Sequence, residues 1–286
     1  EWYRAYSGQV FTSFSGGKDS TVLLDLARQV CPDIPAVYVD TGLEYPELRD
    51  FVKTKDNVIW LLPRYPYTQI LEKYGYPVIS KDISDVISGA RKGQPYRLAR
   101  LNGESLDKNG KKSIYNCEKY KYLLDAPFAI SARCCYYMKK APLNKFERQS
   151  GRHPITGVLA CESKLREQSY LKFGCNGYER RRPLSQPLAF WREEDILRYL
   201  RMTGIPYTPI YGDIGEVKKR NGALTLKTTG VSRSGCMYCM YGVHLEHEPN
   251  RFQLMEKTHP QQYHYCIHEL GLGAVLDYIG VPYSCR

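Results

Sequence analysis

The sequence predicts an α/β fold with a doubly wound, mostly parallel sheet, and three observations support this. Short apolar runs typical of strands recur along the chain, at residues 9–14, 37–39, 58–62 and 154–159. Amphipathic runs typical of helices alternate with them, most clearly at 21–30. Glycine-rich or polar segments follow the strand-like runs at their carboxyl ends. This alternation favours parallel strands joined by helices, with ligands bound at the carboxyl edge of the sheet.

The composition is that of a globular protein with an excess of positive charge. Hydrophobic residues make up 43% of the 286 residues and charged residues 25%, close to the usual values. The 41 Lys and Arg against 30 Asp and Glu give a net charge of +11, which favours an anionic partner such as a nucleic acid or the phosphates of a nucleotide. We find no apolar run of about twenty residues and no secretory signal, so we expect a cytoplasmic protein without a membrane partner.

A glycine-containing loop joins the first strand-like run to the first helix-like run. It reads Ser15-Gly16-Gly17-Lys18-Asp19-Ser20. Glycines let backbone N–H groups close on phosphate oxygens, and the start of a helix adds a positive dipole. Lys18 and the serine hydroxyls supply further donors. The spacing differs from that of the Walker loop. The alternative interpretation is an ordinary glycine turn that begins a helix.

This loop resembles the SGGxDS loop, or PP-loop, of the ATP pyrophosphatase or adenine nucleotide alpha hydrolase superfamily. A second segment, Asp40-Thr41-Gly42-Leu43-Glu44-Tyr45-Pro46-Glu47, resembles the DTGxxxPE segment of phosphoadenosine phosphosulfate (PAPS) reductase-like proteins. It follows the second apolar run, so we place it at the same edge of the sheet. The resemblance implies an adenine nucleotide alpha hydrolase-like fold. It also implies nucleotide contacts from the whole loop and from Asp40, Thr41 and Gly42, with Lys18 and Asp19 acting in catalysis.

A third segment follows the strand-like run at 154–159 and contains Arg166-Glu167-Gln168-Ser169. It resembles the family segment in which an arginine faces a phosphate or sulfate group, and a guanidinium suits that role because it binds oxyanions in bidentate fashion. The resemblance implies that Arg166 is catalytic and that Arg166, Gln168 and Ser169 contact the nucleotide. The alternative is an exposed loop with surface charges.

Ten cysteines in a chain of this length favour metal ligation over a disulfide scaffold. The adjacent pair Cys134-Cys135 and the distant Cys236-Met237-Tyr238-Cys239 offer four thiolates. With Lys139 and a Pro-Leu dipeptide, they resemble the [4Fe-4S] site of adenylylsulfate (APS) reductases. The resemblance implies that these four cysteines are metal ligands and that Lys139 couples the cluster to the nucleotide. Zinc and inert free thiols are the alternatives.

We expect one nucleotide-binding PP-loop domain over residues 1–235 and a C-terminal extension over 236–286, tied back to it by the cluster. Residues 88–112 are rich in Gly, Lys, Arg and Asn and predict an irregular insertion or flap. Its basic residues, and the run Arg180-Arg181-Arg182, could meet phosphates or be solvated. These insertion residues are Arg91, Lys92, Arg97 and Arg100.

Three functions fit these patterns. The first is adenylation of an acceptor, such as a nucleic acid, by ATP, followed by sulfur transfer. The second is reduction of APS or PAPS to sulfite, for which the sequence shows no Glu-Cys-Gly-Leu-His motif. Cys266 was considered as a substitute nucleophile. The third is a non-catalytic module that binds a nucleotide or a nucleic acid.

The adenine nucleotide is ATP in the first case and APS or PAPS in the second. Mg²⁺ is a further candidate cofactor. The sulfur source would be a cysteine desulfurase or a thiol reductant, and the sequence does not predict the oligomeric state.

Overall fold

The computed structural model describes residues 1–220 and 222–285. The chain forms two compact units, each built from two stretches of sequence. Unit 1 comprises Glu1–Pro63 and Ala141–Cys236, and unit 2 comprises Arg64–Lys140 and Met237–Arg286. We expected a boundary after residue 235, and the chain passes from unit 1 to unit 2 for the second time after Cys236; the division into a nucleotide-binding domain and an extension stays a prediction. The excursion of residues 64–140 into unit 2 was not expected.

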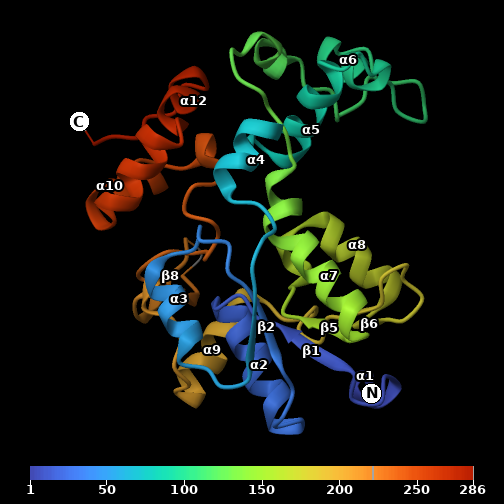
Figure 1. Ribbon diagram of the computed structural model, residues 1–286, viewed down its shortest axis with the longest axis vertical. Coiled ribbons are helices and arrows are strands. Elements are labelled where there is room, and N and C mark those ends of the chain that lie inside the picture. Colours follow the sequence, from blue (N-terminus) through green and yellow to red (C-terminus); the bar gives the residue numbers. More distant parts are fainter. Residues whose placement is uncertain (221, 286) are drawn as a thin grey trace. The chain divides into compact units, whose positions relative to one another are not determined.

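Unit 1 contains a six-stranded sheet in the order β3-β2-β1-β5-β7-β6. All neighbouring strands are parallel except β6, which runs antiparallel to β7. Figure 1 shows β2, β1 and β5 side by side. The mostly parallel α/β sheet confirms the predicted fold class. The strands are β1 Val10–Ser13, β2 Ala36–Val39, β3 Val58–Leu61, β5 His153–Thr156, β6 Asn176–Gly177 and β7 Leu184–Ser185.

Helices cover both faces of this sheet. Val10 packs with Val22 and Ile196 of the helices α2 and α9 in one apolar cluster. Phe11 follows Val10 in β1 and so points to the opposite face, where its ring contacts Phe146 of α7 at a centroid distance of 5.2 Å. The helices of unit 1 are α1 Trp2–Ala5, α2 Lys18–Val30, α3 Pro46–Lys53, α7 Ala141–Ser150, α8 Lys164–Phe173 and α9 Glu193–Thr203, with 3₁₀ turns η3 Ala160–Glu162 and η4 Pro209–Tyr211. A hairpin of β8 Ile214–Lys218 and β9 Leu224–Thr228 completes the unit.

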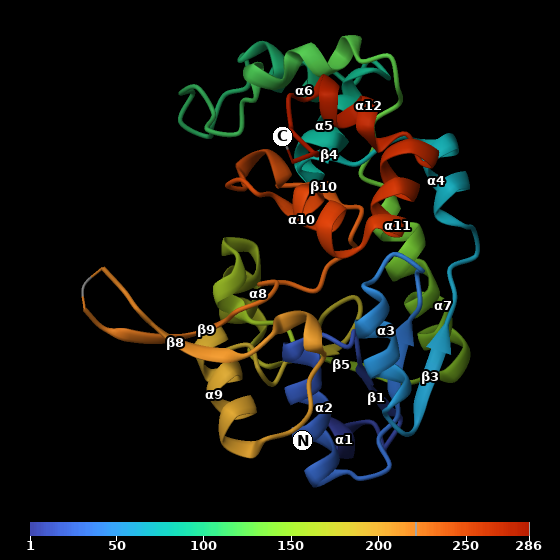
Figure 2. The ribbon, with the colours of Figure 1, turned by 90° about the vertical axis from the view of Figure 1, so that its left-hand side faces the viewer.

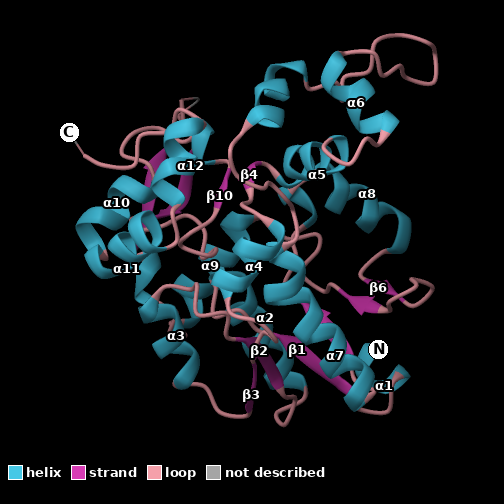
Figure 3. Cartoon of the chain, turned by 45° about the horizontal axis from the view of Figure 1, so that its top comes forward, coloured by secondary structure: helices cyan, strands magenta, loops and turns pink. Residues whose placement is uncertain are grey.

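Unit 2 is mainly helical, as Figure 3 shows for α4, α5, α6 and α10. Its two stretches are joined by parallel pairing of β4 with β10, in which Val78 lies opposite Met240 (Figure 2). Both side chains are fully buried. The elements are α4 Tyr67–Tyr74, β4 Val78–Ile79, α5 Lys81–Ala90, α6 Pro95–Asn102, the 3₁₀ helix η1 Glu118–Asp125, the π-helix η2 Tyr136–Lys140, β10 Met240–Tyr241, the 3₁₀ turn η5 Val243–Leu245, α10 Arg251–Thr258, α11 Pro260–His264, the π-helix η6 Tyr265–Glu269 and α12 Leu272–Tyr278.

The expected insertion at 88–112 is only partly irregular. The helix α5 extends to Ala90, and α6 occupies Pro95–Asn102. The helix α6 ends at Gly103, which adopts a left-handed conformation with φ of +76° that favours glycine. Leu101 is the one buried apolar residue among those of α6, and a helix of eight residues with one buried apolar position gives a weak periodic signal in the sequence.

No helix in the described part of the chain is long and apolar enough to cross a membrane.

Candidate functional site

The loop at 15–20 connects β1 to α2 and is closed by its own hydroxyl groups. The Ser20 hydroxyl accepts a hydrogen bond of 3.1 Å from the Ser15 N–H and donates one of 2.9 Å to the Gly17 carbonyl. Gly16 has φ of +73°, and a Cβ there would lie 2.8 Å from the Leu48 side chain. Only glycine fits this position without rearrangement. The glycine at position 16 is therefore required by the backbone conformation and by the packing against Leu48.

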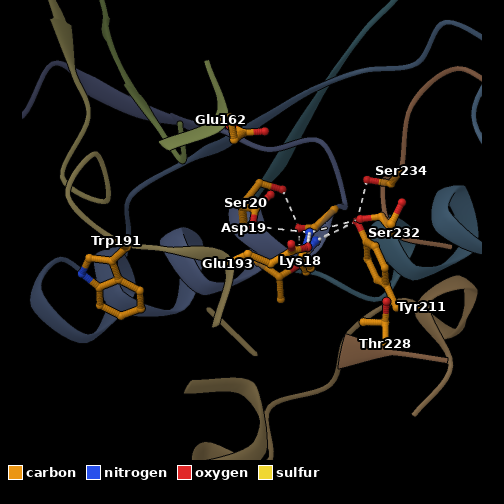
Figure 4. A network of polar contacts seen from close by, with 12 residues as sticks. Lys18, Asp19, Ser20, Glu162, Trp191, Glu193, Tyr211, Thr228, Ser232 and Ser234 are labelled. Atoms are coloured by element: carbon orange, nitrogen blue, oxygen red, sulfur yellow. Dashed lines mark hydrogen bonds and ion pairs between the residues drawn. The ribbon is translucent and has the colours of Figure 1, made fainter. Parts of the chain in front are cut away.

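Lys18 is the first residue of α2, and its side chain is buried, with 5% of the residue exposed. Its Nζ lies 3.1 Å from Glu193 Oε1 and donates to the Ser232 carbonyl at 3.3 Å. Its backbone N–H donates to the Tyr211 hydroxyl at 3.2 Å. Figure 4 shows Glu193 on one side of Lys18 and Tyr211 with Ser232 on the other. A buried ammonium is thus held at the start of a helix, where anions bind.

Asp19 follows Lys18, and one of its carboxylate oxygens is poorly satisfied. Asp19 Oδ1 is buried without a hydrogen-bond partner among the described residues, and it lies 3.8 Å from Lys18 Nζ. Burial raises the pKa of Asp19; Lys18 opposes this shift and Glu193 adds to it. Apart from the ion pair with Lys18, this buried oxygen has unused acceptor capacity that a proton or a bound cation would satisfy.

Residues 209–234 bring further polar groups against the loop. The Tyr211 hydroxyl donates to Ser234 Oγ at 2.7 Å. A Cβ on Gly17 would lie 2.4 Å from that Oγ and 3.2 Å from the Tyr211 hydroxyl. Burial raises the pKa of Tyr211, opposed by its hydrogen bond with Ser234. The absence of a side chain on Gly17 therefore gives two hydroxyl groups direct access to the loop backbone.

The segment that begins at Asp40 follows β2, the parallel neighbour of β1, and therefore lies at the same edge of the sheet. Its side chains are engaged within their own turn. Asp40 Oδ2 accepts a hydrogen bond of 2.8 Å from Arg49 Nε, and Asp40 Oδ1 accepts one of 3.3 Å from the Gly42 N–H. The Thr41 hydroxyl bonds to Glu44 at 2.8 Å. These contacts hold the turn in shape, and nucleotide contacts from Asp40, Thr41 and Gly42 remain a prediction.

Arg166 lies in α8 and forms an ion pair with Glu162. Burial and the nearby charge of Arg233 lower the pKa of Arg166, while Asp19 opposes the shift. Arg166 is therefore near enough to Asp19 to belong to the loop site. Its predicted neighbours behave differently: Ser169 Oγ accepts a hydrogen bond of 2.5 Å from Arg180, and Gln168 is exposed. Among the described residues, neither has a polar contact with the loop.

Sequence reasoning missed several groups of the site, namely Glu193, Tyr211, Ser232, Arg233 and Ser234. The stretch Ser232-Arg233-Ser234-Gly235, directly before Cys236, carries the same group types as the loop at 15–20. That repetition of serine, glycine and a cation was an available signal for a second phosphate-facing segment.

Most arginines that were considered as phosphate contacts have structural partners. Arg91 donates to the carbonyls of Leu123, Ala126 and Phe128, where a 3₁₀ helix ends. The others are paired with carboxylates or polar groups: Arg97 with Asp85, Arg100 with Asp82 and the Tyr115 carbonyl, Arg180 with Ser169 and Gln186, and Arg182 with Glu147. The runs of basic residues at 88–112 and 180–182 therefore contain fewer cations available to an external phosphate than the sequence suggests.

The predicted cluster ligands Cys134, Cys135 and Cys239 belong to unit 2, and Cys236 is the last residue of unit 1 before the crossing. Cys134 Sγ and Cys135 Sγ are 3.9 Å apart. The hydrogen bond from Cys134 and the charge of Lys139 lower the pKa of Cys135 to about 6 against desolvation. Burial raises the pKa of Cys239, and its charge interactions include Cys135 and Lys139.

Within residues 1–220 and 222–285, no three side chains of the His, Cys, Asp or Glu type converge closely enough to hold a metal ion. The iron-sulfur assignment therefore stays a prediction. The remaining cysteine that was considered, Cys266, is fully buried in η6, and burial raises its pKa to about 12. It is therefore not the mobile, exposed nucleophile that we considered.

Comparisons with known proteins give a consistent result. The sequence profile of the family described as "Phosphoadenosine phosphosulfate reductase domain" matches residues 9–59 and 100–240, about two thirds of the chain. An adenosine 5'-phosphosulfate reductase of Staphylococcus epidermidis is 26% identical over 216 residues, covering 73% of this chain and 68% of the relative. The enzyme of the same name from Geobacillus kaustophilus is 27% identical over 215 residues, covering 73% and 70%.

Among solved structures, the phosphoadenylyl-sulfate (PAPS) reductase of Candida auris, in its phosphate complex, aligns with a TM-score of 0.41 and 14% identity. The alignment covers 72% of this chain and 80% of that one. The profile match spans β1, the loop at 15–20, β2, α8 and the residues around Lys18 from 211 to 234. The chain therefore belongs to the phosphoadenosine phosphosulfate reductase domain family and is an enzyme of that family.

Proposed function

We propose that the protein binds ATP at the loop of residues 15–20, transfers AMP to an acceptor with release of pyrophosphate, and thereby prepares the acceptor for sulfur transfer. The observation that carries this proposal is the buried Asp19 Oδ1, which has no hydrogen-bond partner among the described residues and lies next to a buried Lys18. The phosphate and sulfate groups of a sulfonucleotide can be bound by Lys and Arg side chains alone. A nucleoside triphosphate arrives with a divalent cation, which needs an oxygen ligand.

The charges around the loop favour such a cation. Asp19 and Glu193 both lie within ion-pair distance of Lys18 Nζ. A divalent cation held by Asp19 would offset the repulsion between these two carboxylates and a phosphate chain, in addition to the positive charge that Arg166 supplies near Asp19. Mg²⁺ fits this donor set, and Asp19 would hold it. The ion would neutralise charge on the phosphates when it is bound.

The chain's own groups would position the reacting phosphates. The N–H groups at the start of α2, Lys18 Nζ and the hydroxyls of Ser15 and Ser234 would orient the chain of phosphates and stabilise the charge that develops on pyrophosphate. An acceptor oxygen would attack the α-phosphorus while the bond to pyrophosphate breaks. A thiol would release hydrosulfide from the persulfide of a desulfurase and become part of a disulfide. The hydrosulfide would then form the new bond to the acceptor as AMP leaves with the oxygen.

A second candidate is the reduction of APS or PAPS to sulfite. The observation that favours it is the similarity to relatives named adenosine 5'-phosphosulfate reductases. Arg233 lies close enough to Arg166 for its charge to lower the pKa of Arg166. Two neighbouring guanidinium groups would suit a sulfate group. In that reaction a thiolate takes the sulfonyl group from the nucleotide, and AMP leaves from APS or adenosine 3',5'-bisphosphate from PAPS. A second thiol then releases sulfite as the two thiols become a disulfide.

We further propose that Cys134, Cys135, Cys236 and Cys239 hold a [4Fe-4S] cluster. Four thiolates are the usual ligand set of such a cluster, and the close approach of Cys134 Sγ and Cys135 Sγ at 3.9 Å fits ligands of one centre. The cluster would act through structure and charge, because four protein ligands leave no iron open. Lys139 would interact with it electrostatically.

The three functions separate in one experiment. Anaerobically purified protein is incubated with Mg²⁺ and ATP, with APS, or with PAPS, each with a thiol and with candidate acceptors. We expect pyrophosphate from ATP, and this release should require Mg²⁺ and be lost in Asp19→Asn. The control Asp50→Asn, on the exposed side of α3, should behave like the wild type. Sulfite from APS or PAPS without pyrophosphate from ATP would establish the second candidate, and nucleotide binding without any product would establish the non-catalytic module.

A further inference from the structure

A basic cavity of about 310 Å³ lies entirely within unit 2, apart from the loop site in unit 1. Four cationic side chains line it, together with one tyrosine and two serines. The cations are Lys81, Lys92, Arg133 and Lys140, and the tyrosine is Tyr136. These residues come from the helix α5 with the turn after it, and from the segment of residues 131–140.

The residues from α5 and its following turn are spaced so that they share one side. Lys81, Asp85 and Ser88 follow one another at intervals of four and three residues on one face of α5, and Lys92 lies in the turn two residues after the helix ends. At a rise of 1.5 Å per residue α5 is about 14 Å long, so Lys81 and Lys92 lie near its opposite ends. The positive charge is therefore spread along a line and not gathered around a single point.

Few negative charges oppose these cations. Asp85 is the one carboxylate among the described lining residues, and it is already paired with Arg97. Lys81, Lys92 and Arg133 form no ion pair with any described carboxylate, and all three are exposed. In contrast to the arginines at 91, 97 and 100, these three cations are held by no side-chain hydrogen bond or ion pair among the described residues, although the charges of Lys81 and Lys140 act on Cys135 and lower its pKa.

The surroundings of the cavity have the same character. Residues 64–140 contain 15 Lys and Arg but 7 Asp and Glu, so this stretch carries +8 of the total charge of +11. It also exposes large aromatic side chains, and Tyr136, in the cavity wall, is 45% exposed. Other exposed tyrosines of this stretch are Tyr96, Tyr115 and Tyr122. Cations interleaved with exposed aromatic rings are typical of surfaces that bind single-stranded nucleic acid.

We infer that this cavity binds a single strand of nucleic acid, with backbone phosphates along the line from Lys81 to Lys92 and a base stacked on Tyr136. A line of cations along the length of α5 is long enough to contact more than one phosphate of a strand. A free nucleotide would use one end of this line. An acidic peptide would use the cations but not the face of the ring, and a duplex offers no free base to stack on it. Binding here does not depend on the reaction proposed for the loop at 15–20.

The test is the binding of a fluorescein-labelled single-stranded DNA of about 12 nucleotides, within the usual site sizes, to the full chain without nucleotide. Fluorescence anisotropy is followed between about 50 and 200 mM salt. Each phosphate contact contributes about 0.7 to the slope of log K against log salt, so Lys81→Gln with Lys92→Gln should reduce the slope by about 1.4. Tyr136→Ala should weaken binding about fivefold or more with little change in slope, and Tyr136→Phe should retain it.

The matched control is Lys108→Gln with Lys257→Gln, two exposed lysines of unit 2 outside the cavity. It removes the same charge and should leave both affinity and slope near the wild-type values. Equal losses in the control and the cavity variant would overturn the inference, because they indicate attraction by overall charge. So would an absence of binding at the lowest salt, duplex DNA that binds as tightly as the single strand, or polyglutamate that competes as well as an unlabelled oligonucleotide at equal charge.

Discussion

The loop at 15–20 and the basic stretch at 88–112 behave in opposite ways when their sequence patterns are compared with the structure. In the loop, the glycines and hydroxyls have the local roles that the motif predicts, and Lys18 is buried at the start of α2. In the basic stretch, Arg91 and Arg100 are bound internally, and Lys92 alone of the four residues considered lines the basic cavity. The glycine motif therefore predicted the local backbone of its loop, whereas the run of charges did not predict which cations are bound internally. Phosphate binding at the loop stays a prediction.

The reason lies in the distance between partners. The contacts that shape the loop join residues two to five positions apart, so they follow from the motif itself. Arg91 bonds to carbonyls 32 to 37 positions away, and Arg100 bonds to Asp82 across 18 positions. Tertiary structure decides whether such a cation faces solvent or a buried acceptor. The predictions below test both halves of this contrast.

The largest expected effect is on the loop. Lys18→Gln should lower the rate of nucleotide turnover by about 10² to 10³-fold, the usual cost of removing one preorganised group that stabilises developing charge. Turnover is measured as product release at saturating nucleotide, and the fold is checked by circular dichroism. Lys53→Gln, at the exposed end of α3, is the matched control. Unchanged turnover in Lys18→Gln would remove the loop from the active site.

The predicted cluster tests a motif whose two halves, Cys134-Cys135 and Cys236 to Cys239, are about 100 positions apart in sequence. Its ligands, like the partners of Arg91 and Arg100, can meet only through tertiary structure. Serine at Cys134, Cys135, Cys236 or Cys239 should abolish iron and sulfide content, because a [4Fe-4S] cluster needs all four thiolates. The measurement is iron and sulfide analysis of anaerobically prepared protein, with Cys161→Ser as a control on an exposed cysteine. About one zinc per chain without sulfide would identify the zinc site instead.

The arginines of the basic stretch should matter for stability and not for anion binding. Arg100 is 4% exposed and holds Asp82 in two hydrogen bonds, of 3.0 and 2.6 Å, as well as the Tyr115 carbonyl at 2.8 Å. Arg100→Gln should therefore lower the free energy of unfolding by about 2 kcal/mol, less than for a fully buried pair because Asp82 is partly exposed. Lys92→Gln should leave stability unchanged. Denaturant unfolding checks both, and equal effects would contradict the distinction.

The sequence was sufficient for the elements whose signals are local. It predicted β1, the loop and α2 as consecutive elements, and β2 and β3 as further strands. It did not predict unit 2, because that unit depends on the pairing of β4 with β10 across about 160 residues, which no local pattern encodes. It also missed Glu193, Tyr211 and Ser234, because their approach to Lys18 depends on how the chain returns to the sheet edge.

The smallest expected effect concerns Asp19, where function and stability should oppose each other. Burial raises the pKa of Asp19 above its ordinary value of 3.8, so the folded protein favours the protonated form. The stability that this confers is fully present below pH 3.8 and is lost as the pH rises through the raised pKa. At neutral pH the charged carboxylate therefore destabilises the nucleotide-free protein.

Asp19→Asn imitates the protonated form. It should raise the free energy of unfolding at pH 7 by about 1 kcal/mol, the usual gain when a functional residue under strain is replaced. The gain should shrink toward zero as the pH falls below the ordinary pKa of an aspartate. Urea unfolding at several pH values measures it, and Asp50→Asn, which changes an exposed carboxylate, should show no comparable gain. A loss of stability at neutral pH would mean that the Asp19 carboxylate is satisfied in the free protein, and the need for a cation at this position would disappear with it.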